Sequence, residues 1–173
     1  MLQYKGMRLL FPMLLTLAAC GDGGTSQDTG APAGLCEATN DPLLELAQYG
    51  PYGELDDGAD CLFGHPPQGG APYAPFSLRI SGMDQDDLGM DVQMTATDAD
   101  SGEILGTGDY LQRFICSNVG DNDGKFVGAD LHMRFYGWEL SELEGRTADV
   151  LISVSNDNGD RVEAGFQGLL IRE

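Results

Sequence analysis

Residues 149–166 read Asp-Val-Leu-Ile-Ser-Val-Ser-Asn-Asp-Asn-Gly-Asp-Arg-Val-Glu-Ala-Gly-Phe, and this stretch decides the fold class. Apolar residues recur at every second position on both sides of a turn-forming centre: Val150, Ile152, Val154, Val162, Ala164 and Phe166. A period of two is typical of strands that bury one face. Asn158-Gly159 between the two runs predicts a type I′ turn, in which both central residues need positive φ. The stretch therefore predicts an antiparallel hairpin.

The same alternation recurs upstream, beginning at Phe76. It covers residues 76–81, 91–96 and 131–136, with shorter strands expected near 103–105 and 111–116. Together these segments predict about seven strands in an all-β, antiparallel β-sandwich, Ig-like or prealbumin-like. Residues 139–144 predict a single helical turn between strands. The 25 glycines of the chain agree with a turn-rich β protein.

One short helix is predicted ahead of the strands. Asp41 can cap a helix and Pro42 suits its first turn. Leu43, Leu44, Leu46 and Ala47 would form its apolar face before Gly50 ends it.

The first residues have the pattern of an export signal. Lys5 and Arg8 precede a mostly apolar run at 9–17, which is shorter than the roughly 20 residues that a bilayer-spanning helix needs. A charged start, a short apolar run and small residues before a cleavage point define a secretory signal peptide.

Leu17-Ala18-Ala19-Cys20 resembles the lipobox of bacterial lipoproteins. The resemblance implies cleavage before Cys20 and a diacylglycerol on its sulfur, which would anchor the chain to a membrane. Gly21, where no Asp follows the cysteine, implies the outer membrane of a Gram-negative cell, facing the periplasm or the surface. The alternative is an ordinary secreted protein with a cysteine after its cleavage point.

Four parts follow from these patterns. Residues 1–19 are a lipoprotein signal peptide, and 20–35 form a flexible linker of Gly, Ser, Thr, Asp, Ala and Pro. Residues 36–75 form a Cys/Gly/Pro-rich lead segment with the short helix, and 76–173 form the sandwich domain.

The net charge of the chain limits the classes of partner that it can bind. The full sequence has a formal net charge of −19, and loss of residues 1–19 removes two bases and no acid, leaving −21. Such a charge disfavours nucleic acid and anionic lipid as partners and leaves a cationic or metal-bound partner open.

The cysteines predict one disulfide. If lipid occupies Cys20, then Cys36, Cys61 and Cys116 remain, enough for one bond and one spare thiol. The favoured pair is Cys36–Cys61, because both lie in a stretch poor in other structure, and Cys61–Cys116 is the alternative. A leftover Cys116 would be a small buried hydrophobe.

Acidic turns are the candidate metal sites. Asp98 and Asp100 lie in one turn, and Asp121 and Asp123 lie in another. Calcium takes six to eight oxygen ligands, so such loops could hold it. Neither turn fits an EF-hand loop, and Asp is also an ordinary turn residue, which is the preferred interpretation.

The sequence contains no catalytic motif that we recognise. His65 and His132 are not flanked by a nucleophile motif, and no Gly-x-Ser-x-Gly or phosphate-binding glycine loop occurs. A glycan-active enzyme with paired carboxylates is the lowest-ranked alternative. Trp138, Tyr136, Tyr110 and Tyr73 could form a stacking surface, although Trp138 is expected to close the core instead.

Three segments carry a resemblance to carboxypeptidase-regulatory-like and CnaB-like β-sandwiches. They are 76–82 (Phe-Ser-Leu-Arg-Ile-Ser-Gly), 92–104 and 121–126 (Asp-Asn-Asp-Gly-Lys-Phe). The lipobox together with the Tyr/Gly/Pro-rich lead at 71–76 also resembles radical SAM-associated putative lipoproteins, which implies a neighbouring radical SAM enzyme. The stretch 106–118 is longer than the spacing in those domains.

These observations predict a lipid-anchored interaction module of the cell envelope that binds a protein or a glycan and not nucleic acid. A calcium-dependent adhesion domain is the second hypothesis. No cofactor is expected beyond calcium.

Overall fold

The computed structural model describes residues 36–39, 41–48, 55, 57–85 and 88–173, and these residues form nine strands in one sheet. The sheet order is β1-β3-β7-β5-β4-β8-β9-β2, and β6 pairs with β7 beside this path. The strands are β1 Leu43–Ala47, β2 Asp60–Phe63, β3 Tyr73–Ser81, β4 Met90–Asp98, β5 Ile104–Gln112, β6 Ile115–Ser117, β7 Lys125–Arg134, β8 Thr147–Ser155 and β9 Arg161–Arg172.

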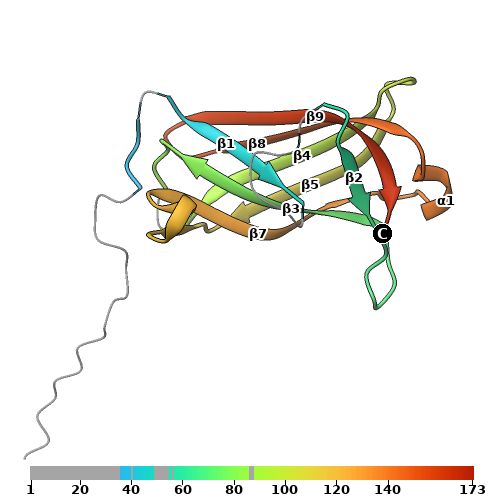
Figure 1. The fold of residues 1–173 in the computed structure, drawn as a ribbon, viewed down its shortest axis with the longest axis horizontal. Helices are drawn as coiled ribbons and strands as arrows, with labels where there is room; N and C mark the ends of the chain where they lie inside the picture. Colours follow the sequence, from blue (N-terminus) through green and yellow to red (C-terminus); the bar gives the residue numbers. More distant parts are fainter. Residues whose placement is uncertain (1–35, 40, 49–54, 56, 86–87) are drawn as a thin grey trace, which may run out of the picture.

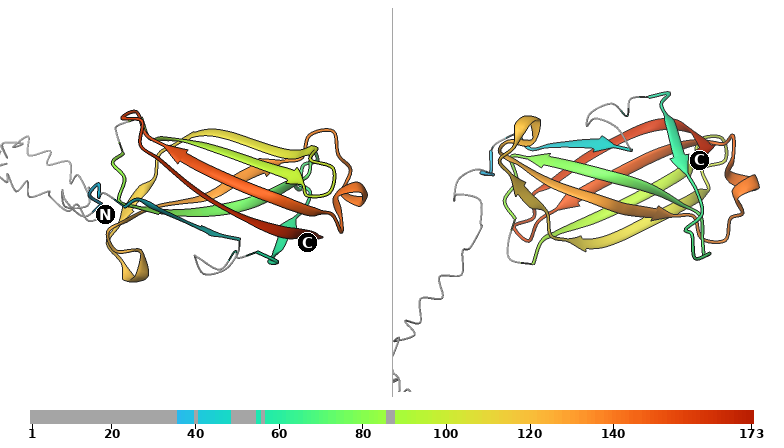
Figure 2. Two further views of the ribbon diagram at one scale, coloured as in Figure 1. Left: turned by 90° about the horizontal axis from the view of Figure 1, so that it is seen from above. Right: turned by 60° about the horizontal axis from the view of Figure 1, so that its bottom comes forward.

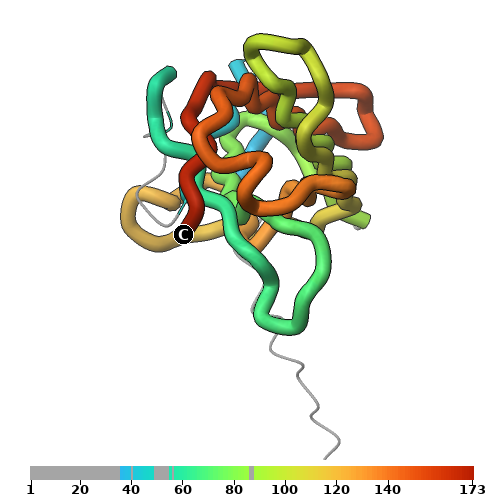
Figure 3. Tube along the Cα trace, turned by 90° about the vertical axis from the view of Figure 1, so that its right-hand side faces the viewer, coloured from blue at the N-terminus to red at the C-terminus, as the bar shows by residue number. Residues whose placement is uncertain are grey.

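The sheet curls around its own core (Figures 1 and 3). Gln48 lies where the outer strands approach each other. Its Nε2 donates to the carbonyl oxygens of Leu62 and Pro75, at 3.1 and 3.0 Å, and its Oε1 accepts from the Leu62 amide at 2.8 Å. The all-β prediction is confirmed, with the strands arranged as a sandwich-like half-barrel rather than two clearly separate sheets.

The predicted inward faces are also confirmed. Side chains at alternating positions fill the curled sheet, including the fully buried Phe76, Leu78, Ile80, Met94, Met133, Phe135 and Ile152. The helical turn is α1, Leu140–Leu143, where Glu139 and Glu142 form a reciprocal capping box. Leu143 turns into the core and fixes α1 to the sheet.

The helix predicted from Asp41 onward is wrong, because these residues form β1. Leu43 pairs with Ser81 and Ala47 with Ser77, antiparallel to β3. Leu44, Leu46 and Ala47 are buried in this arrangement. Helix nucleation is costly for so short a segment, whereas a strand gains ladder hydrogen bonds and burial along an existing edge.

The turn between β8 and β9 is also not type I′. Gly159 has a φ of +87°, but Asn158 is not among the described residues with positive φ. The turn is wider, since the Asn156 amide donates to the Asp160 carbonyl at 3.1 Å. The Asn156 side chain also stabilises this turn, because its Oδ1 accepts a hydrogen bond from the Asp160 amide at 2.9 Å.

The strands run between two ends of the molecule (Figures 1 and 2). The Cys36 end contains residues 36–39 and 41–43, the described part of the β3–β4 connection, β6 and the 3₁₀ turn η1, Gly120–Asn122. The α1 end contains α1 and the β4–β5 turn at 99–103. Strands β1 and β2, from the predicted lead segment, belong to the same sheet as the strands after residue 76.

Candidate ligand-binding groove

A hollow of about 700 Å³ lies on the outer face of β4, β8 and β9. Two rows of outward residues cross these strands. Thr97, Asp149 and Gln167 are register partners in the first row, and Thr95, Leu151 and Gly165 are partners in the second. Both rows lie in the half of the sheet nearer the α1 end, since Asp98 directly precedes the β4–β5 turn. We call this site the outer groove.

Asp57 forms one wall of the outer groove. Its Oδ1 accepts from the Gln167 amide at 2.9 Å, and the Gly58 amide donates to the Gln167 carbonyl at 2.6 Å. These two bonds take the place of a strand partner along β9, ahead of the point where β2 begins to pair. Asp57 and Gly58 are therefore held against β9.

Gly165 keeps the floor of the outer groove low. A Cβ at this position would lie 2.6 Å from the Val150 carbonyl oxygen, closer than real Cβ contacts. The neighbouring Leu151 side chain is 48% exposed and is the apolar part of the floor.

The polar groups of the outer groove define what it can bind. The described lining has two carboxylates, Asp57 and Asp149, with the hydroxyls of Thr95 and Thr97 and the amide of Gln167, and it contains no Lys, Arg or His. Gln167 Nε2 donates to Asp149 Oδ1 at 2.8 Å, which orients that carboxylate across the first row. The arrangement suits a ligand that brings positive charge or hydrogen-bond donors.

The predicted metal ligands have other roles or stand apart. Asp98 Oδ1 accepts from the amide and the hydroxyl of Ser101, both at 2.8 Å, and Arg146 Nη1 lies 3.1 Å from Asp98 Oδ2. The Ser101 bonds, with Arg146, hold the pKa of Asp98 below its ordinary value. Asp98 is thus a turn-capping residue paired with a cation, and Asp100 is exposed in the same turn.

Asp121 lies in η1 and Asp123 directly follows it, at the opposite end of the molecule from Asp98. Arg79 Nη1 donates to the backbone carbonyl of Asp121 at 3.3 Å. The structure therefore does not bring the two acidic turns together. Across the described residues, no three His, Cys, Asp or Glu side chains gather as a metal site would require.

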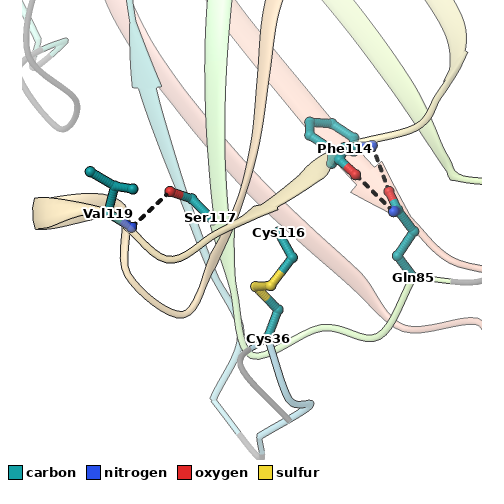
Figure 4. The surroundings of a disulfide bond; sticks show 6 residues. All are labelled: Cys36, Gln85, Phe114, Cys116, Ser117 and Val119. Carbon is teal, nitrogen blue, oxygen red and sulfur yellow. Dashed lines mark hydrogen bonds between the residues drawn. A yellow bond between two sulfur atoms is a disulfide. The ribbon is translucent and has the colours of Figure 1, made fainter. Parts of the chain in front are cut away.

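The disulfide joins Cys36 to Cys116, with a Cα–Cα distance of 6.0 Å, and not to Cys61 as the sequence predicted (Figure 4). Cys61 follows the inward alternation of β2, between the exposed Asp60 and the partly exposed Leu62, and is fully buried. Burial raises the pKa of its thiol to about 12, with Gln48 acting in the opposite direction. The spare thiol is therefore Cys61, and Cys116 is the residue that fixes the start of the described chain.

The aromatic residues do not form one surface. Trp138 is partly buried against the core, and the Arg146 guanidinium lies over its ring at 4.6 Å from the centroid. Tyr73 stacks on His132 with ring centroids 4.4 Å apart, on the outer side of β3 and β7. Tyr136 is exposed. The core role expected for Trp138 fits this packing.

The outer groove was missed by sequence reasoning. Alternation identifies Thr95, Asp149 and Gln167 as outward residues, but it marks every other outward residue equally. The contact between Asp57 and β9 spans 110 positions. Only the Gly at 165, at an interior strand position, gives a local signal of a low surface.

No protein-family model matches the chain, and no curated protein matches it. Within the described residues, no helix is both long and apolar enough to cross a membrane.

Proposed function

We propose that the mature chain is a lipid-anchored interaction module of the bacterial envelope, whose outer groove binds a basic segment of a partner protein. The lipobox at 17–20 supports the anchor, and Gly21 supports the outer membrane as its location. Two lipid chains hold a protein on a membrane stably, whereas one binds only marginally.

The observation that carries the proposal is the position and charge of the outer groove. It presents Asp57 and Asp149 without a cation in its described lining. It lies in the half of the sheet remote from the Cys36 end, where the chain enters from the predicted linker. A partner can therefore reach it while the module stays anchored. On the same outer face, Arg161 is engaged by Glu163 at 2.6 Å and by Ser153 at 3.2 Å, so it does not neutralise the groove acids.

The net negative charge of the mature chain also favours a cationic partner. With 28 acids and 7 bases after signal cleavage, the module attracts cationic segments and speeds their encounter. No three His, Cys, Asp or Glu side chains gather among the described residues, so their geometry gives no comparable support to calcium binding.

Site-specific photo-crosslinking tests the partner. A photoreactive residue at Leu151, in the outer groove, is compared with one at Ile104, which is also exposed but lies beyond the β4–β5 turn. We expect a discrete crosslinked protein from Leu151 and not from Ile104. Asp149→Lys should abolish that product, while Asp109→Lys, the same charge change at an exposed position of β5 outside the groove lining, should preserve it. Identical products at both sites, or a product unaffected by Asp149→Lys, would contradict the proposal.

The anchor is tested separately. The intact mass of the membrane-extracted protein should equal residues 20–173 plus the lipid, and Cys20→Ser should release the chain from the membrane fraction. An unmodified Cys20 in the mature protein would overturn the anchor without bearing on the groove.

A further inference from the structure

Exposed aliphatic side chains gather at the Cys36 end. Of the nine large hydrophobic residues that are exposed in the described chain, five lie at this end, on four different segments: Leu43, Leu88, Leu111, Ile115 and Val119. Register places three of them at the same end of the sheet, because Leu43 pairs with Ser81, Leu111 pairs with Asp91, and Ile115 pairs with Val127. Ile115 and Val119, at 74% and 71%, are the two most exposed.

Ile115 and Val119 border a hollow of about 440 Å³. Cys116 and, from β7, Val127 and Ala129 also line it, together with the polar residues Ser117, Asn118 and Asn122. Strand β6 and the turn after it are held in place: Gln85 bonds the amide and carbonyl of Phe114 at 2.6 and 2.9 Å, and the Val119 amide donates to Ser117 Oγ at 3.3 Å (Figure 4). These bonds therefore hold the backbone on either side of Ile115 and at Val119 in place.

The predicted tether joins the fold at the same place. Cys36 is bonded to Cys116, which lies between Ile115 and Ser117 and lines the hollow itself. Sixteen residue steps separate Cys20 from Cys36, so the chain between them can extend to at most about 55 Å. A lipid on Cys20 would thus keep these aliphatic side chains within that reach of the bilayer, where even a weak contact has a high effective concentration.

We propose that this surface, formed by Leu43, Leu88, Leu111, Ile115 and Val119 and here called the apolar end, rests on the bilayer to which the chain is anchored. This inference rests on the proposed lipid anchor and adds an orientation to it. Moving exposed apolar surface into the interfacial region of a bilayer is favourable, and each of these five aliphatic side chains would contribute to the binding free energy. Contact at the apolar end directs α1 and the half of the sheet with the outer groove away from the membrane.

The charge of the apolar end selects the type of lipid. Asp84, Asp91 and Asp121 are exposed at this end and would repel anionic headgroups. The surface therefore fits a zwitterionic bilayer, and added anionic lipid should weaken the contact.

Fluorescence quenching by brominated phosphatidylcholine tests the contact. The full mature lipidated chain, in a Trp138→Phe background, has a single tryptophan introduced as Ile115→Trp, and Ile104→Trp at the α1 end is the matched control. Both positions are exposed isoleucines in the native chain, at 74% and 60%. In phosphatidylcholine vesicles we expect blue-shifted and strongly quenched emission from Ile115→Trp and unchanged emission from Ile104→Trp. Adding Val119→Asp to the Ile115→Trp chain should restore most of the lost emission.

A second measurement uses the chain without a reporter. Hydrogen exchange of residues 113–119 should slow when the lipidated chain is moved from detergent into vesicles, while exchange of 99–104 should not change. Equal quenching at both positions, or none at either while mass spectrometry shows the lipid on Cys20, overturns the contact and leaves the anchor intact. Protection that depends on protein concentration and persists in a Cys20→Ser chain without vesicles would instead assign the surface to a second copy and overturn the proposal. A chain without lipid on Cys20 would overturn the anchor and this inference together.

Discussion

The Tyr110 hydroxyl donates a hydrogen bond to the backbone carbonyl of His132, joining β5 to β7 where their ladder stops. Thr107–Arg134 is the one register pair between these two strands in the described sheet. Past that pair the strands diverge, and the phenol supplies a partner that a backbone amide would otherwise provide. Gly108 permits the arrangement, since a Cβ there would lie 3.0 Å from the Tyr110 ring.

Replacing this phenol should weaken the fold. Tyr110→Phe keeps the ring but leaves the His132 carbonyl without that donor, at a cost of about 1–2 kcal/mol in the free energy of unfolding. Urea denaturation of the variant and the parent measures the difference. Tyr136→Phe is the matched control, because the Tyr136 side chain is 67% exposed and its loss of a hydroxyl should change little. Equal changes in the free energy of unfolding of the two variants would show that the junction of β5 and β7 does not depend on the Tyr110 hydrogen bond.

The contact between the Phe114 ring and Gly128 of β7 leads to a second prediction about stability. A Cβ on Gly128 would lie 2.5 Å from the Phe114 ring, which is buried. Gly128→Ala should therefore overpack this site and lower the free energy of unfolding by about 1–3 kcal/mol. Gly64→Ala should be nearly neutral by comparison, since a Cβ there meets nothing closer than 3.9 Å. Phe114→Leu combined with Gly128→Ala should recover part of the loss, and strict additivity of the two changes would argue against a direct clash.

The parts of the fold that sequence predicted are those governed by local alternation. Val150, Ile152 and Val154 are buried as their period of two required, because each strand has one face against a single core. The contacts that sequence could not predict join distant segments. Leu43–Ala47 has a sequence suited to a short helix, and only the edge of β3, whose paired residues lie thirty or more positions later, makes it a strand.

The disulfide error has the same origin. Cys36 and Cys61 are close along the chain, and both flank Gly/Pro-rich sequence, so proximity favoured pairing them. Cys61 instead faces inward in β2, which pairs with the C-terminal strand β9, while Cys36 lies beside β6. The alternation of Asp60, Cys61, Leu62 and Phe63 was a signal that Cys61 is buried. The partner of Cys36, 80 residues away, had no local signal.

The corrected pairing predicts a specific thiol pattern. Non-reducing peptide mapping should link Cys36 to Cys116. Because Cys61 is fully buried and its pKa is raised to about 12, alkylation of the native protein should leave its thiol unmodified at neutral pH. Cys36→Ser with Cys116→Ser should lower the free energy of unfolding by about 4 kcal/mol, since the bond closes a loop of 80 residues. Cys61→Ala should keep the Cys36–Cys116 peptide, and its loss in that variant would contradict the assignment.

Acid sensitivity should depend on Glu45, which joins β1 to two cations. Arg79 Nε lies 2.8 Å from Glu45 Oε2, and Lys125 Nζ lies 3.1 Å from the same oxygen. The Arg79 hydrogen bonds, followed by those of Lys125 and opposed by burial, hold the pKa of Glu45 below its ordinary value of 4.5. The unfolded chain therefore binds more protons in the interval between the two values. The stabilisation is complete above the unfolded pKa and is lost as pH falls through the folded pKa.

The melting temperature of the parent should thus fall as pH is lowered from about 6 to about 3, and Asp98, whose pKa is also lowered, should contribute to the fall. Glu45→Gln should melt lower at neutral pH, by an amount equivalent to about 3 kcal/mol, because the buried Arg79 loses its carboxylate. The same variant should lose less stability than the parent over the acid range, since one of the titrating groups is gone. Glu163→Gln breaks only the half-exposed pair with Arg161 and should follow the parent at every pH. If the melting temperature of Glu45→Gln falls as steeply with decreasing pH as that of the parent, the Arg79–Glu45–Lys125 group does not control acid unfolding.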